Sequence, residues 1–195
     1  MSAQHFKPDP QRGFVLVTSI VLLMIITLLA LGMFRGFATQ EHIAGNLREK
    51  ERAFHAAVSA EQYAEWWLLQ PGNTSGGAVT CASGSTMSAN NNQGQICNQT
   101  PFAAGYTVAQ PSTWGFYVTY LPTGMGIVGG AAGTNNDPPY AATPAFYIAD
   151  VGPSGDGQGE AYQIDAYSYG ATTNTVAVVE SVYELQQGLI NRGGL

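Results

Sequence analysis

Histidine and lysine are absent from most of this sequence. His5, His42 and His55 all lie within the first 70 residues, and residues 71–195 contain neither histidine nor lysine. Without histidine there is no Ser-His-Asp or Cys-His constellation and no histidine-ligated zinc site. Without lysine there is no Schiff-base nucleophile and no lysine to bind a phosphate. We therefore expect no catalytic site and no cofactor in residues 71–195.

Positive charge is scarce in the same region. Residues 71–195 hold seven acidic residues and a single base, Arg192, so they carry the whole formal net charge of −6. Nucleic acids and anionic lipids are bound by basic surfaces, which these residues cannot form. We therefore expect no nucleic-acid partner.

Only two cysteines occur, Cys81 and Cys97, with 15 mostly polar residues between them. In an exported chain such a pair favours one disulfide, worth roughly 3 kcal/mol through restriction of the unfolded state. The alternative is a pair of free or metal-binding thiols, which the lack of accompanying histidines disfavours.

Metal-binding patterns are also few. Asp150, Asp156 and Glu160 gather in the glycine-rich stretch DVGPSGDGQGE and are weak calcium candidates. Their spacing does not follow the EF-hand rule, and acidic residues in such stretches usually belong to solvated turns. We expect no metal site there, with calcium kept as a minor alternative.

Proline is missing from Gln11 to Gln70, and charge is missing from Phe14 to Phe34. As a helix, those 21 uncharged residues are about 32 Å long, enough to span a membrane and longer than the apolar core of a usual secretory signal. Lys7 and Arg12 precede the span, and the positive-inside rule keeps them in the cytoplasm. We expect a single membrane span with the N-terminus inside and the C-terminus outside.

The helix is predicted to continue to about residue 70 as an amphipathic segment. Apolar residues recur at spacings of three, four and seven and form one stripe, which consists of Ile43, Leu47, Phe54, Ala57, Val58, Ala60, Ala64 and Trp67. The other face holds the charged residues between Glu41 and Glu65. We expect the stripe to pack on the chain's own outer domain, or else on a partner helix, and Pro71-Gly72 to end the helix.

Residues 71–195 have the length of one domain and are rich in strand-like alternation. The expected strands are 104–110, 114–121, 145–151, 161–170 and 174–185, with the last two joined by GATTN as an antiparallel hairpin. Residues 124–144 and 152–160 are expected to form long exposed loops. The fold class is thus α+β, with a mainly antiparallel sheet packed against a long N-terminal helix.

The leader ending in QRG, the apolar run FVLVTSIVLLMIITLLALGMF, the continuous amphipathic helix and the closing stretch YQIDAYSYGATTNTVAVVESVYEL resemble the type IV pilin family. They are most similar to the PilX-like minor pilins. The resemblance implies three parts: a prepilin leader (1–13), a long helix (14–70) whose transmembrane half is 14–34, and an outer globular β-rich domain (71–195).

The resemblance also implies processing. In this family a membrane-embedded prepilin peptidase cuts after the glycine that precedes the apolar run, here between Gly13 and Phe14, and the new N-terminal Phe14 is N-methylated. Major pilins carry a glutamate as the fifth residue of the mature chain, where this sequence has Thr18. Threonine cannot form the family's ion pair with a neighbouring subunit's N-terminal amine, which favours a rare subunit near the tip.

The implied function is structural: a minor pilin that primes or caps assembly of a type IV pilus, without catalysis. Its implied partners are other minor pilins, the major pilin, the prepilin peptidase and the inner-membrane pilus assembly platform. Its implied location is the inner membrane, with a periplasmic C-terminus, before assembly and the extracellular pilus afterwards. The alternatives are a minor tip pseudopilin of type II secretion and a single-pass membrane-anchored adhesin or binding module.

Overall fold

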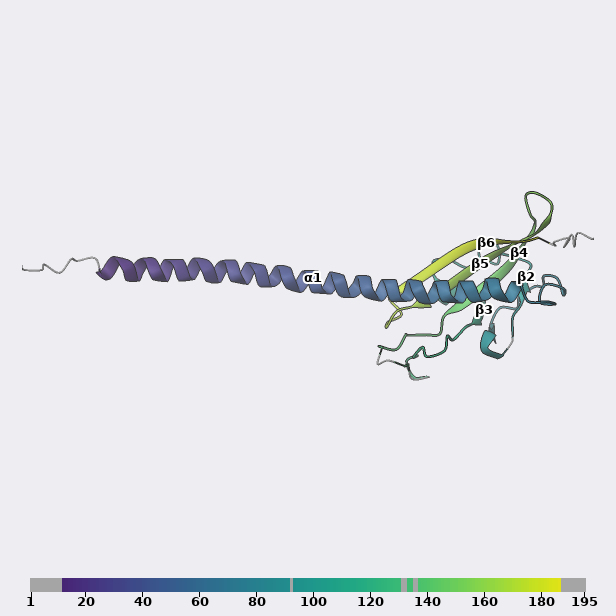
Figure 1. Ribbon diagram of the computed structural model, residues 1–195, viewed down its shortest axis with the longest axis horizontal. Coiled ribbons are helices and arrows are strands. Elements are labelled where there is room, and N and C mark those ends of the chain that lie inside the picture. The colour runs from purple at the N-terminus through teal and green to yellow at the C-terminus, as the bar shows by residue number, and fades with distance from the viewer. Residues whose placement is uncertain (1–11, 92, 131–132, 135–136, 187–195) are drawn as a thin grey trace, which may run out of the picture. The chain divides into compact units, whose positions relative to one another are not determined.

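The computed structural model of this protein describes residues 12–91, 93–130, 133–134 and 137–186. The chain divides into two compact units, Met1–Leu47 and Arg48–Leu195. One α-helix, α1 (Arg12–Leu68), begins in the first unit and ends in the second. The strands all lie in the second unit and form one six-stranded sheet (Figure 1).

The helix ends where the sequence predicts. α1 stops at Leu68, three residues before Pro71, because the residues that precede a proline are driven out of helical geometry. Gly72 then adopts a left-handed φ of +92°. The side-chain amide of Asn73 donates to the carbonyl oxygen of Trp67 at 2.8 Å, which satisfies one of the carbonyls left open at the helix end.

The sheet is mainly antiparallel, as predicted, and the α+β fold class is confirmed. Its order is β1-β3-β4-β5-β6, with β2 paired to β4; the β3–β4, β4–β5 and β5–β6 pairs are antiparallel and the other two pairs are parallel. The predicted hairpin around GATTN joins β5 to β6. The strands are β1 (Ser85–Ser88), β2 (Ile96–Cys97), β3 (Phe116–Thr119), β4 (Ala145–Pro153), β5 (Gly159–Tyr169) and β6 (Val176–Gln186).

Two parts of the strand prediction are wrong. Residues 104–110 form turns: Gly105 has a φ of +86°, and the backbone N–H of Tyr106 donates to Pro101 at 2.9 Å. Tyr106 and Val108 pack against the core from this irregular segment, so their alternation arises without a strand. The loop predicted at 152–160 is shorter than expected, because β4 runs to Pro153 and β5 begins at Gly159, which leaves residues 154–158 as the loop.

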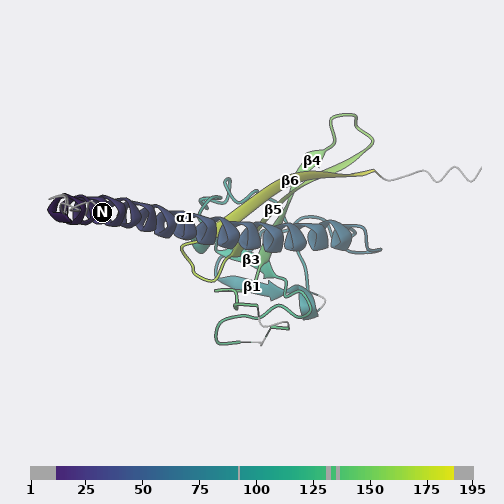
Figure 2. The ribbon, with the colours of Figure 1, turned by 60° about the vertical axis from the view of Figure 1, so that its left-hand side comes forward.

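The last turns of α1 cover one face of the sheet through small side chains (Figure 2). Close approach of the backbones is possible because the fully buried positions are alanines, namely Ala53, Ala57, Ala60 and Ala64. Tyr63 stacks on Tyr120 with ring centroids 4.4 Å apart and lies 6.0 Å from Phe146 of β4. The helix face and the sheet thus share one core.

The predicted apolar stripe is only partly confirmed. Trp67 and the alanines of the stripe are buried, but Phe54 is 48% exposed, and Ile43 and Leu47 are also exposed. The spacing gives the period of the helix correctly. It predicts a stripe wider than the face that the sheet covers, because positions i, i+3 and i+4 are spread over about 100° around a helix.

The predicted disulfide joins Cys81 to Cys97, whose Cα atoms are 5.3 Å apart. Cys97 is fully buried in β2, which pairs with β4, and Val79 forms an isolated bridge with Cys97. The bond therefore fastens the segment that follows α1 to the middle of the sheet.

Candidate functional site

The first unit exposes a continuous apolar surface. The large apolar side chains from Phe14 to Phe34 are each at least half exposed, on all sides of α1. Among the described residues, α1 is the one helix long and apolar enough to cross a membrane, and its most apolar window is unburied. An apolar surface of this size is covered in a functioning protein by lipid or by other apolar helices.

Gly13 and Phe14 lie in the first turn of α1, and both are exposed. A Cβ atom added to Gly13 would meet nothing within 4 Å, so the described packing of this chain does not require glycine here. A requirement for glycine at this position would come from another protein that acts on the chain. The leader up to Gln11 lies outside the described residues.

Thr18 uses its hydroxyl within its own helix. Its Oγ1 donates to the carbonyl oxygens of Phe14 at 3.1 Å and Val15 at 3.0 Å, a local arrangement common for threonine in helices. The hydroxyls of Ser19 and Thr27 donate to carbonyls three residues earlier in the same way. The span therefore presents neither a charge nor a free hydroxyl donor, and association through it depends on apolar packing.

One turn of α1 contacts two loops of the second unit, around Pro138 and Ala171, through charged side chains. The sequence pattern predicted these side chains on the helix face opposite the apolar stripe. Glu49 accepts a hydrogen bond from the N–H of Ala171 at 2.8 Å, and this bond, more than the neighbouring Arg52, lowers the pKa of its carboxyl. Arg52 donates to Glu49 at 2.9 Å and to the carbonyl of Pro138, and its guanidinium lies 4.5 Å from the ring centroid of Tyr140. The i,i+3 spacing of Glu49 and Arg52 was the only sequence signal for this contact.

A buried carboxyl lies on the opposite face of the sheet. Asp165 of β5 is fully buried and is paired across the strands with Tyr147 of β4 and Glu180 of β6. Gln163 donates to its Oδ2 at 2.9 Å, whereas its Oδ1 has no hydrogen-bond partner among the described residues. Burial, together with the like charge of Glu180, raises the pKa of Asp165 to about 7 against the opposing bond from Gln163. The sequence gives no local signal for this pair, because Asp165 and Glu180 meet only when β5 and β6 pair.

The Asp165→Asn variant is expected to stabilise the protein at pH 8 by roughly 2 kcal/mol and to change it little at about pH 3.5, where the carboxyl is mostly protonated in both states. The folded-state pKa of Asp165 lies above its unfolded value of 3.8, so this group costs nothing below about pH 4 and destabilises progressively up to about pH 7. Denaturant titrations of the full chain in micelles at both pH values measure the difference. Glu180→Gln, which removes only the like charge, should give a smaller gain with the same sign. Parallel stability curves for wild type and Asp165→Asn would contradict the assignment.

The calcium candidates are already engaged in turn hydrogen bonds. Asp150 accepts from the N–H of Gly152 at 2.8 Å, and Asp156 accepts from Ser154 at 2.6 Å. Within the described ranges no group of three or more His, Cys, Asp or Glu side chains has a metal-binding arrangement. The calcium hypothesis for Asp150, Asp156 and Glu160 gains no support from this geometry.

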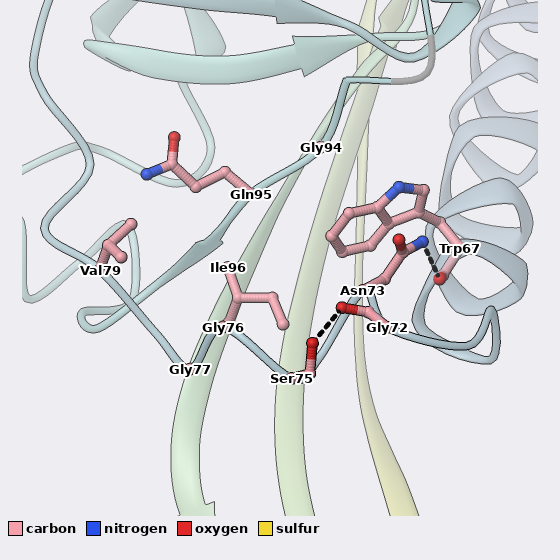
Figure 3. A pocket seen from close by; sticks show the side chains of 10 residues that line it. All are labelled: Trp67, Gly72, Asn73, Ser75, Gly76, Gly77, Val79, Gly94, Gln95 and Ile96. Carbon is pink, nitrogen blue, oxygen red and sulfur yellow. Dashed lines mark hydrogen bonds between the residues drawn. The ribbon is translucent and has the colours of Figure 1, made fainter.

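A shallow hollow of about 380 Å³ lies where α1 ends (Figure 3). Trp67 forms one wall, and Gly94 lies so close beneath its indole that a Cβ there would come within 2.4 Å of the ring. The other lining residues are glycines, Asn73, Ser75, Val79, Gln95 and Ile96. None of the described residues that line this hollow has an ionisable side chain, so they supply no acid, base or charged ligand-binding group.

The comparison with protein families gives one match. The family model described as PilX N-terminal matches residues 12–59, which are 48 of the 195 residues and include both the apolar span and the Glu49–Arg52 turn. No curated protein and no solved structure matches the chain significantly. Type IV pilins are structural proteins that assemble with other pilins, and the long apolar helix agrees with a membrane-anchored member. Residues 12–59 are therefore similar to the N-terminal segment of the PilX-like type IV pilins.

Proposed function

We propose that this protein is a minor pilin that enters a type IV pilus early, in low copy and near the tip, where it primes or caps assembly. The observation that carries the proposal is the exposed apolar surface of residues 13–34 within a segment similar to PilX N-termini. In a bilayer this surface holds the subunit before assembly. In a filament the same surface packs against the helices of neighbouring subunits, so one segment serves both states.

The proposed maturation follows from the family resemblance. The prepilin peptidase removes residues 1–13 on the cytoplasmic side, and Phe14 becomes the methylated N-terminus. The outer domain then lies in the periplasm until the subunit passes from the inner-membrane assembly platform into the extracellular pilus. Exposure of Gly13 and Phe14 is compatible with access by a peptidase.

The tip position rests on Thr18. In the family, a glutamate at this position is thought to compensate the buried N-terminal amine of a neighbour, and an uncompensated charge in an apolar core costs several kcal/mol. If the pairing runs from each subunit's carboxylate to the amine of the subunit ahead, the first subunit has no amine to meet. Thr18, with its hydroxyl bonded within its own helix, loses nothing in that place.

Immunogold labelling of sheared pili with antibodies to the outer domain tests the position. We expect sparse label confined to one end of each filament, and fewer pili when the chain is deleted. Thr18→Glu is expected to raise label along the shaft at least several-fold, because it restores the countercharge, whereas Thr18→Val should leave label at the end. Dense label along the shaft in the wild type would contradict the tip position.

The same strains separate the two alternatives. A type II tip pseudopilin would leave pilus number unchanged on deletion and reduce secretion instead. A single-pass adhesin unrelated to filaments would keep its leader and would not appear on sheared pili at all. We propose no catalytic role, because residues 71–186 lack the histidine and lysine that most nucleophilic and acid–base sites use.

A further inference from the structure

The outer strand β6 is an unprotected sheet edge. It is the last strand in the sheet order, and its 11 residues pair with β5 in unbroken register from Val176 to Gln186. Figure 1 shows it in yellow beside β5. Every second residue of such a strand directs its N–H and C=O away from the partner strand. Among the described residues, the one hydrogen bond to this outer side comes from Lys50, whose ammonium donates to the carbonyl of Val176.

Of the usual devices that prevent edge pairing, this strand has only charged side chains, Glu180 and Glu184. Soluble proteins blunt exposed edges with lysine, proline, bulges or very short strands. The β6 sequence VAVVESVYELQ contains neither lysine nor proline, and its pairing with β5 has no bulge. The opposite edge of the sheet, β1, has only four residues. β6 is therefore the edge at which an added strand would gain the most backbone hydrogen bonds.

The side chains beside this edge are acidic and exposed. Glu180, Val182 and Glu184 occupy alternate positions on one face of β6, and Val182 is 66% exposed. Behind Glu180 lies the buried carboxyl of Asp165 with its unpartnered Oδ1. No lysine or arginine occurs between Arg52 and the end of β6 to offset these charges.

We propose that the free edge of β6 binds a β-strand of another protein whose side chains are basic. Backbone pairing at the edge gives affinity, and lysine or arginine side chains placed opposite Glu180 and Glu184 give specificity. A second copy of this chain fits badly, because two paired β6 strands place four glutamates and no basic side chain on one face of the joined sheet. Nucleic acid and anionic lipid are repelled by the same charges. This inference concerns the outer domain alone and does not depend on a place in the pilus.

The test uses the full chain in neutral micelles and a fluorescent ten-residue peptide of alternating lysine and valine, with binding followed by anisotropy. We expect saturable binding that weakens with salt, and about tenfold weaker binding to the Glu180→Gln/Glu184→Gln double variant. The matched control, Glu51→Gln/Asp137→Asn, removes two exposed charges elsewhere in the second unit and should bind as the wild type does.

Two further probes separate strand pairing from charge attraction. The same peptide methylated at every backbone nitrogen keeps its lysines but cannot form a ladder, so it should not bind measurably. A Val182→Cys variant should not form disulfide-linked dimers, since copies do not pair. Equal binding of the methylated peptide, equal binding to the double variant, absence of any binding, or efficient Val182→Cys dimerisation would each overturn the proposal.

Discussion

Replacing Gly13 by leucine is expected to convert the chain from a fully processed form to one that keeps its 13-residue leader. A Cβ at Gly13 meets nothing within 4 Å, so the substitution should leave the folding of α1 and the outer domain unchanged. The leucine side chain would instead obstruct the approach of a peptidase to the backbone of the bond between Gly13 and Phe14. Intact-mass measurement of the membrane fraction reads both the leader and the methyl group on Phe14.

Gly45→Leu provides the matched control for this experiment. Gly45 also lies in α1 with nothing within 4 Å of its added Cβ, but it is far along the chain from the bond that would be cut. It should be processed as the wild type is. A Gly13→Leu chain that begins at Phe14 would show that cutting at this bond does not require glycine, a wild-type chain that begins at another residue would show that the cleavage site is elsewhere, and a wild-type chain that keeps its leader would favour a simple membrane anchor.

The features that the sequence predicted well depend on contacts that are local along the chain. The extent of α1 follows from an uninterrupted run without proline and from the Pro71-Gly72 pair at its end. Strands β4, β5 and β6 are long and rich in β-branched and aromatic residues, so their alternation is less ambiguous than that of a short segment. The Cys81–Cys97 bond was predictable because no other pairing exists.

The features that were missed depend on partners distant in the chain. β1 has four mostly polar residues, and β2 has only two residues, too few to show alternation. They form strands only because their backbones pair with β3 and β4 respectively. The same holds for the charged contacts. Glu49 is placed by a backbone N–H 122 residues away, and Asp165 faces Glu180 only after β5 and β6 have paired. Local periodicity carries no information on such contacts.

Removal of the disulfide is expected to lower the free energy of unfolding by about 3 kcal/mol, which is a large part of the stability of a domain of this size. The bond closes a loop with a sequence separation of 16, and that loop contains both β1 and β2. In the Cys81→Ala/Cys97→Ala variant the unfolded chain regains the entropy of this loop, while β2 keeps its pairing with β4. Denaturant titration of the full chain in micelles measures the loss.

The loss should be uneven across the sheet, because the bond holds β2 and the segment around Val79 but no part of β5 or β6. Backbone amides of β1 and of the segment around Val79 should exchange with solvent faster in the variant, since the disulfide tethers both to β4 through Cys97. Amides of β5 pair with β4 and β6 on either side, so their exchange should become faster only as far as the lower free energy of global unfolding requires. Wild type treated with a reductant serves as the control and should reproduce both effects, because it lacks the same covalent link. If reduction left stability and exchange unchanged, the bond would not be what holds the segment after α1 to the sheet.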